Sequence, residues 1–232
     1  MSEPTPHIPD DFLPGDVPAR RTRLRPGERR EQILRALAAM LERPGAERIT
    51  TAALARQLSV SEAALYRHFA SKAQMFEGLI DFIEHSVFTL VRQVVEHPGE
   101  ASDVQRAAHI AAMVLQFGER NPGMVRVMVG DALVFENERL QQRMNLFFDK
   151  LEAALRQCLR PAAEAEGAAA PTVQAQVRAA ALCDLMRGRL QRYARSGFRR
   201  LPTEHLDATL ALLSKLLNAP FWGASGSPHA RG

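Results

Sequence analysis

The chain has 232 residues, of which 46% are hydrophobic and 24% are charged. This length suits one medium-sized domain, or a small domain fused to a larger one, and it can bury a core without disulfides or metal ions. The formal net charge of +4 is small, and by itself it does not indicate a nucleic-acid partner.

Sequence patterns of membrane proteins, secreted proteins and common enzymes are missing. No apolar run approaches the roughly 18 residues of a transmembrane helix, and the start of the chain lacks the apolar segment of a secretory signal. There is no CxxC, HExxH or GxSxG motif, no glycine-rich phosphate loop, and no His or Cys spacing typical of a metal site. We therefore expect a protein that is not an enzyme and that has no metal ion or cofactor.

The two cysteines, Cys158 and Cys183, lie in apolar stretches with helical periodicity. One disulfide between them is possible, but two buried free thiols are the preferred interpretation. Free thiols suit a reducing compartment, so the sequence favours the cytoplasm.

The charge is unevenly distributed along the chain. Residues 1–19 contain four acidic residues and no Lys or Arg, whereas residues 20–72 contain twelve Lys and Arg against five acidic residues, a net charge of +7. Six of those arginines lie within residues 20–30, and the remaining part of the chain, residues 73–232, has a net charge of only +1. A basic N-terminal region on a nearly neutral body is typical of a nucleic-acid-binding domain attached to a second, larger domain.

Hydrophobic periodicity predicts helices throughout and no strands, so the expected fold is all-α with about nine helices. Residues 1–27 are predicted to be a disordered arm, acidic first and then rich in arginine, and residues 219–232 a flexible tail. A small domain is expected over 28–73 and a larger helical domain over 74–218. The longer helices are expected over residues 28–43, 72–97, 103–119, 137–159, 172–195 and 203–218, with a further helix from Pro122 and a loose linker over 161–171.

The most informative segment is ITTAALARQLSVSEAALYRHFASK, residues 49–72. Thr50 and Thr51 are candidate caps of a first short helix, and Ser61 is a candidate cap of a second, with a tight four-residue turn between them. The apolar face of the first helix is expected to consist of Ala52, Leu54, Ala55 and Leu58, and Leu65 and Phe69 are expected to point inward from the second. A helix, a tight turn and a second helix form the unit that places its second helix in the major groove of DNA; a plain helical hairpin is the alternative.

The string from Ala55 through Val60–Ser61 and Leu65–Phe69 to Lys72 resembles the helix-turn-helix of the TetR family. That resemblance implies a three-helix DNA-binding head, a larger helical body whose last two helices form a homodimer, and binding to palindromic double-stranded DNA. Ser59 stands where such turns commonly have glycine, at some cost in backbone energy. The positions implied to face DNA are Thr50, Thr51, Ser61, Glu62, Ala63, Tyr66, Arg67, His68 and Lys72.

Within that family, residues 48–76, 117–130 and 132–148 resemble the nucleoid occlusion factors. This resemblance implies a nucleoid-associated protein that, while bound to chromosomal DNA, binds the C-terminal tail of the tubulin-like division protein FtsZ and blocks septum assembly. The implied tail-binding residues are Phe82, Met113, Arg120 and Asn121, with Gln116 departing from the small residue usual at its position.

Several alternatives remain open from the sequence. Phe82 and Met113 also fit simple core packing, and Arg120–Asn121 also fits a plain junction between two helices. The leucines of the last two helices fit either one chain's core or a dimer interface, which is preferred because one small head reads only a half-site. The alternative function is that of a repressor controlled by a small ligand bound in the body.

Overall fold

The computed structural model describes residues 27–43, 49–97, 99 and 101–217, and in these ranges the chain forms nine α-helices, one short 3-10 helix and no strand. This confirms the expected all-α fold. The predicted arm, apart from Gly27, and the predicted tail lie outside the described residues. The helices are α1 (Glu28–Leu41), α2 (Thr51–Gln57), α3 (Glu62–Tyr66), α4 (Lys72–Glu96), α5 (Asp103–Arg120), α6 (Pro122–Met128), the 3-10 helix η1 (Asp131–Leu133), α7 (Glu138–Ala165), α8 (Pro171–Arg195) and α9 (Leu206–Leu217).

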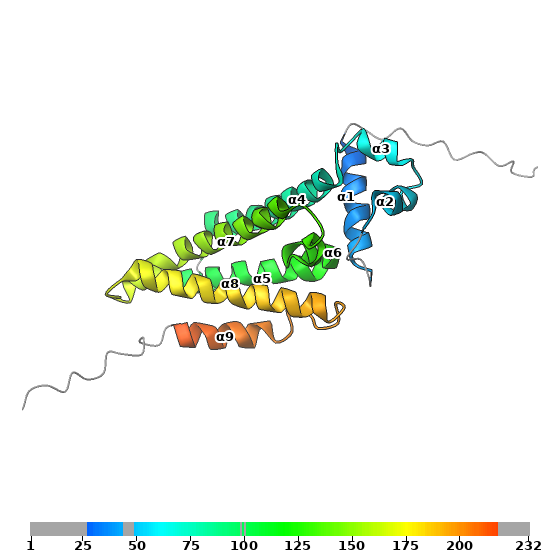
Figure 1. The fold of residues 1–232 in the computed structure, drawn as a ribbon. Coiled ribbons are helices and arrows are strands. Elements are labelled where there is room, and N and C mark those ends of the chain that lie inside the picture. Colours follow the sequence, from blue (N-terminus) through cyan, green and yellow to red (C-terminus); the bar gives the residue numbers. More distant parts are fainter. Residues whose placement is uncertain (1–26, 44–48, 98, 100, 218–232) are drawn as a thin grey trace, which may run out of the picture.

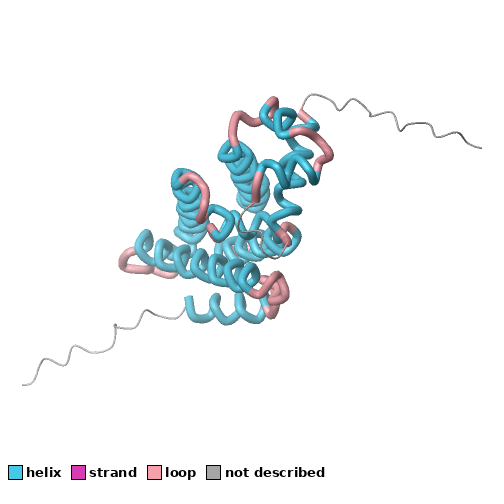
Figure 2. The backbone as a smooth tube through the Cα atoms, turned by 45° about the vertical axis from the view of Figure 1, so that its right-hand side comes forward, coloured by secondary structure: helices cyan, strands magenta, loops and turns pink. Residues whose placement is uncertain are grey.

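Helices α1, α2 and α3 form a small head at one end of the molecule, and the other helices form an elongated body (Figure 1). Helix α4 starts in the head and runs unbroken into the body, so the predicted boundary between residues 73 and 74 falls in its first turn. In the body, α4 lies beside α7, α5 and α8 form the middle, and α9 is outermost. Figure 2 shows the same arrangement from another side, with short loops joining the long helices.

One continuous hydrophobic core extends from the head into the body. In the head, Ile33 and Leu37 of α1 pack with Leu65 and Phe69, which point inward as predicted. Of the expected apolar face of α2, Leu54 and Ala55 are buried and Leu58 is half-buried, but Ala52 is exposed. That part of the prediction is wrong because a helix that begins at Thr51 places Ala52 on the face opposite Leu54.

Helix α7 differs from the sequence-based expectation over residues 161–171. Helix α7 continues through Pro161 to Ala165, so the predicted loose linker is wrong. Pro161 lacks the N–H that would bond to the preceding turn, but the surrounding alanines favour a helix and Ala163 is fully buried. The helix ends at Ala165, and Gly167 two residues later has a φ of 70°, which allows Gly167 N and Ala168 N to donate to the carbonyl oxygens of Glu164 and Ala163.

Close approach of α6 to α1 joins the body to the head. A Cβ atom at Gly123 of α6 would lie 2.0 Å from the backbone oxygen of Ala38 in α1, so only glycine permits this spacing. Pro122 begins α6 and Asn121 occupies the N-cap position, as expected. The Asn121 side chain does not cap the helix, however, because its amide nitrogen donates to the backbone oxygen of Phe117 at 2.7 Å.

Both cysteines are free thiols, as predicted, with Cys183 buried and Cys158 half-buried. Burial raises the pKa of the Cys183 thiol to about 12 and also raises the pKa of the Cys158 thiol. Among the described helices, none is both long enough and apolar enough to cross a bilayer.

Candidate DNA-binding surface and partner site

The turn between α2 and α3 has the geometry that the sequence predicted, with serine where glycine is usual. Ser59 has a φ of 52°, which lies in the left-handed region. Its backbone N–H donates to the carbonyl oxygen of Arg56, and the N–H of Val60 donates to that of Ala55. These two bonds end α2 and set the direction in which α3 leaves the turn.

Hydroxyl caps begin the three helices around this turn. The side-chain oxygens of Thr50, Ser61 and Ser71 accept from the N–H of Ala53, Ala64 and Gln74 at 3.1, 3.2 and 3.2 Å. The Thr50 and Ser61 caps were expected, because Ser and Thr directly before an apolar helical run favour this position. Each hydroxyl uses its acceptor here, so its own O–H remains a donor that a phosphate oxygen can accept.

The outer face of α3 presents the side chains expected to read DNA. Ala63, Tyr66 and Arg67 are exposed, and His68 is half-buried. The carbonyl oxygen of His68 accepts from Arg30 at 2.5 Å, which fastens the end of α3 to α1. This face therefore combines an aromatic ring, a guanidinium and a small residue on a braced helix, a combination suited to base edges and phosphates.

Three of the predicted DNA contacts, Thr51, Glu62 and Lys72, have side-chain partners within the chain. The Thr51 hydroxyl donates to the Glu62 carboxylate at 2.6 Å and joins the starts of α2 and α3. Lys72 pairs with Glu136 at 2.5 Å, and its side chain is only 30% exposed. Neither partner follows from sequence spacing, because Lys72 and Glu136 are 64 residues apart. DNA contact by these residues stays a prediction and requires that DNA compete with these bonds.

Comparison with known proteins identifies the family. Residues 33–79 match the model for bacterial regulatory proteins of the tetR family, and residues 102–218 match the SlmA-like model for the tetracyclin repressor-like C-terminal domain. The chain is 50% identical to nucleoid occlusion factor SlmA of Vibrio cholerae over 187 residues, which cover 80% of this chain and 94% of that protein. The relative of the same name from Vibrio atlanticus is 49% identical over 191 residues, with 82% and 96% covered. The chain belongs to the SlmA branch of the TetR family.

Solved structures show the TetR fold of this SlmA-family chain independently. A transcriptional regulator from Rhodococcus sp. Rha1 matches with a TM-score of 0.64 and 20% identity, covering 81% of this chain and 95% of that one. FadR of Bacillus subtilis, solved in complex with stearoyl-CoA, matches with a TM-score of 0.61 and 14% identity, covering 79% and 96%. At these identities the likeness concerns the fold alone.

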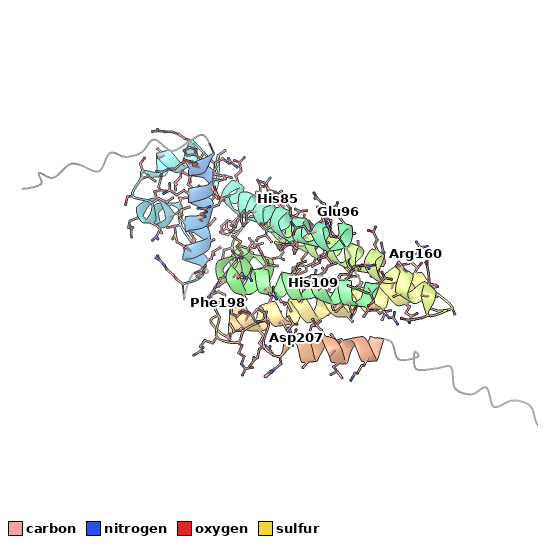
Figure 3. All side chains as sticks on the ribbon, turned by 180° about the vertical axis from the view of Figure 1, so that it is seen from behind. His85, Glu96, His109, Arg160, Phe198 and Asp207 are labelled. Carbon is pink, nitrogen blue, oxygen red and sulfur yellow. The ribbon has the colours of Figure 1, made fainter. Side chains whose placement is uncertain are left out.

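The residues implied to bind a partner tail lie on the neighbouring helices α4 and α5 and at the start of α6. Phe82 on α4 is 42% exposed, so the alternative of simple core packing is wrong for this residue. Met113 on α5 is half-buried against the core, and Arg120, two turns later on the same face, is exposed. Figure 3 labels His85 and His109, which lie one turn from Phe82 and Met113 on the two helices. Gln116 is exposed between Met113 and Arg120.

One charged feature of the SlmA-family body was missed at the sequence level. Residues 185–203 contain six arginines and no acidic residue, although residues 73–232 as a whole are nearly neutral. A charge average over the whole body hid this cluster, and a sliding window of about 20 residues reveals it. Among the described residues, no group of three or more His, Cys, Asp and Glu side chains is arranged to hold a metal ion.

Proposed function

We propose that this SlmA-family protein is a nucleoid-associated homodimer that binds palindromic chromosomal sites and, while bound, engages the C-terminal tail of FtsZ to block septum assembly. The observation that carries the proposal is the identity of about 50% with SlmA proteins over most of the chain, head and body together. Bodies of TetR-type proteins serve different ligands and partners, so likeness in the body is the informative part.

The head supports the DNA-binding half of the proposal. Its turn and helix caps hold a short exposed helix, and a dimer presents two such helices to the major groove. The expected half-sites lie one helical turn apart, about 34 Å, or a multiple of that distance.

The dimer requires an apolar surface that one chain leaves uncovered. Of the residues on which the expected interface rested, Leu182, Met186 and Leu190 of α8 and Leu206 and Leu210 of α9 are buried in the core of their own chain, whereas Ala180, Leu185 and Leu213 are half-buried. Other residues of the same two helices provide the exposed apolar surface. Val173 and Val177 of α8 are 62% and 43% exposed, and Leu212 of α9 is exposed as well. We therefore assign the interface to this outward face of α8 and α9.

The partner site combines apolar contact with one unpaired charge. Phe82 and Met113 offer apolar surface on adjacent helices, and Arg120 forms no ion pair with another described residue. A short peptide with apolar side chains and an acidic residue fits this pattern, because the guanidinium pairs readily with a carboxylate.

The test replaces Arg120 by aspartate, Arg120→Asp, and measures binding of a fluorescent FtsZ tail peptide to the protein with and without DNA. Charge reversal is expected to weaken peptide binding by at least 10-fold, with DNA affinity unchanged. Arg160→Asp, at the opposite end of the body (Figure 3), makes the same charge change and should leave both affinities unchanged. Equal peptide affinity in the Arg120→Asp protein and the Arg160→Asp control would refute the assigned site.

The alternative of a ligand-controlled repressor has less support. The pocket between α6, α7 and α8, lined by Met128, Val129 and Phe148 with polar neighbours, has a volume of about 150 Å³. Sites for small organic ligands usually enclose roughly 300–1,000 Å³. This pocket is therefore too small for a typical effector, and the two larger hollows of the body, of about 550 and 570 Å³, lie open on the surface and do not enclose a ligand.

A further inference from the structure

A ladder of ion pairs joins α4 to the start of α7. In the body, acidic side chains of α4 pair with basic side chains of α7, as between Asp81 and Arg143 at 2.6 Å. The pair nearest the head has the opposite polarity, because Lys72 of α4 pairs there with Glu136, which lies just before α7. Figure 1 shows that α7 begins beside the start of α4, at the end of the body nearest the head. Since Lys72 is also a predicted DNA contact, this pair links the DNA-binding surface to the body.

Two contacts hold the Lys72 ammonium against the body. Its Nζ atom lies 2.5 Å from a carboxylate oxygen of Glu136 and 5.7 Å from the centroid of the Phe76 ring, which is buried one turn later in α4. The aromatic face attracts a cation, and the carboxylate neutralises its charge. An ammonium held in this way attracts a DNA phosphate less strongly than the ammonium of an unpaired lysine.

The segment that carries Glu136 has a well-anchored backbone. Leu133 before it and Leu140 after it are buried in the core. The N–H of Glu136 donates to the carbonyl oxygen of Leu133 at 3.0 Å, and the N–H of Leu140 donates to that of Asn137 at 2.9 Å. Because the Glu136 side chain is only 10% exposed, removal of Lys72 would take the counter-charge from a nearly buried carboxylate, which is unfavourable.

We propose that Glu136 restrains DNA binding by holding Lys72 back from the phosphate backbone of the duplex. A phosphate that binds Lys72 must first displace Glu136, and the cost of leaving that carboxylate without its counter-charge lowers the DNA affinity. Glu136 thus acts through Lys72 and sets the affinity without touching DNA. Because Glu136 belongs to the body, the affinity of the head for DNA depends on how α4 packs against the start of α7. The proposal rests on the DNA-binding half of the function proposed above and not on FtsZ.

The test is a double-mutant cycle on the full-length protein, with Glu136→Gln, Lys72→Gln and the two substitutions together. The probe is a short DNA duplex selected for binding from a random pool, and fluorescence anisotropy measures its affinity at several salt concentrations. Glu138→Gln is the matched control, because it removes the same charge from an exposed side chain two residues away. This control corrects for the weaker general repulsion of DNA by a less acidic protein.

Glu136→Gln is expected to raise the DNA affinity by at least about 3-fold. Lys72→Gln is expected to lower the affinity, and the slope of log affinity against log salt should fall by about 0.9 per chain. In the Lys72→Gln background, Glu136→Gln should have no further effect, because it acts through Lys72. Glu138→Gln should change the affinity by less than about 2-fold, because an exposed charge is screened by salt.

The two single variants lose the same ion pair, so a purely structural role of that pair would change the DNA affinity in the same direction in both. The proposal is overturned by an unchanged or lower affinity in Glu136→Gln, by an equal rise in the Glu138→Gln control, or by a rise that persists in the Lys72→Gln background. An unchanged salt slope in Lys72→Gln overturns it as well. In all these cases the wild-type protein still binds the duplex, so the DNA-binding half of the proposed function stands; a wild-type protein that binds no duplex would refute that half and this proposal together.

Discussion

Ser59 holds a left-handed backbone conformation that costs an L-residue with a side chain about 1 kcal/mol. Because glycine adopts this conformation without that cost, we expect Ser59→Gly to raise the free energy of unfolding by about 0.5–1 kcal/mol. DNA affinity should stay the same, because the turn geometry is already the productive one. Urea denaturation of the two proteins measures the difference. A less stable glycine variant would contradict the claim that the Ser59 backbone is strained.

Arg178 is a buried charge whose pairing stabilises the end of the α7–α8 hairpin. Its two terminal nitrogens donate to the two carboxylate oxygens of Glu166 at 3.0 and 2.6 Å. In the Glu166→Gln variant the Arg178 guanidinium loses this carboxylate, and we expect the free energy of unfolding to fall by about 2–3 kcal/mol. The expected loss is smaller than for a fully buried pair because the Glu166 side chain is 35% exposed.

The matched control is Glu164→Gln, which breaks the exposed pair of Glu164 with Arg160 one turn away. Pairs of this kind contribute only about 0.5 kcal/mol or less. Chemical denaturation of both variants should therefore show a clear difference, and equal losses would mean that the buried pair contributes no more than a surface pair.

At the scale of elements, local signals predicted the helices well and tertiary contacts poorly. Thr50, Ser61 and Ser71 cap their helices through bonds to residues three positions later, so their role is visible in a short window of sequence. The continuation of α7 through Pro161 depends on burial of its later residues against other helices, which overrides the local helix-breaking signal.

The packing of α6 against α1 joins the head to the body, and Gly123 makes it possible. In a Gly123→Ala variant the new methyl group would overlap the backbone of Ala38, so the helices must separate, at a cost of about 1–3 kcal/mol. Gly188→Ala is the matched control, because it meets nothing and replaces glycine within a helix, which stabilises by about 0.5–1 kcal/mol. Thermal unfolding should show shifts of opposite sign, and a stabilised Gly123→Ala protein would contradict the close contact.

At the scale of the whole molecule, the sequence predicted which residues form the candidate site but not which residues contact them. The recognition residues lie together in one stretch of sequence, whereas Phe82 and Met113 lie on two helices, α4 and α5, that only the tertiary packing brings side by side. The partners of Thr51 and Lys72 lie on other elements, so no spacing rule finds them. The arginine-rich segment, residues 185–203, does not show in domain totals because acids elsewhere in the body cancel its charge.

The proposed dimer gives a prediction about assembly. Val177→Glu introduces a charge into the outward face of α8, where burial against a second chain would cost several kcal/mol. We expect the chain of 25.7 kDa to sediment as a dimer and the variant as a monomer with much weaker DNA binding. Val134→Glu, on an exposed residue outside α8 and α9, is the control that should remain dimeric. A dimeric Val177→Glu protein would place the interface elsewhere.

Mapping the chromosomal sites bound in living cells tests the control of division most directly. A protein that delays septum assembly over unsegregated DNA must occupy many sites around the chromosome. It must also leave free the region that segregates last, so that division can proceed there. We predict this distribution, and binding at a single site beside a neighbouring gene would contradict it and indicate a local repressor.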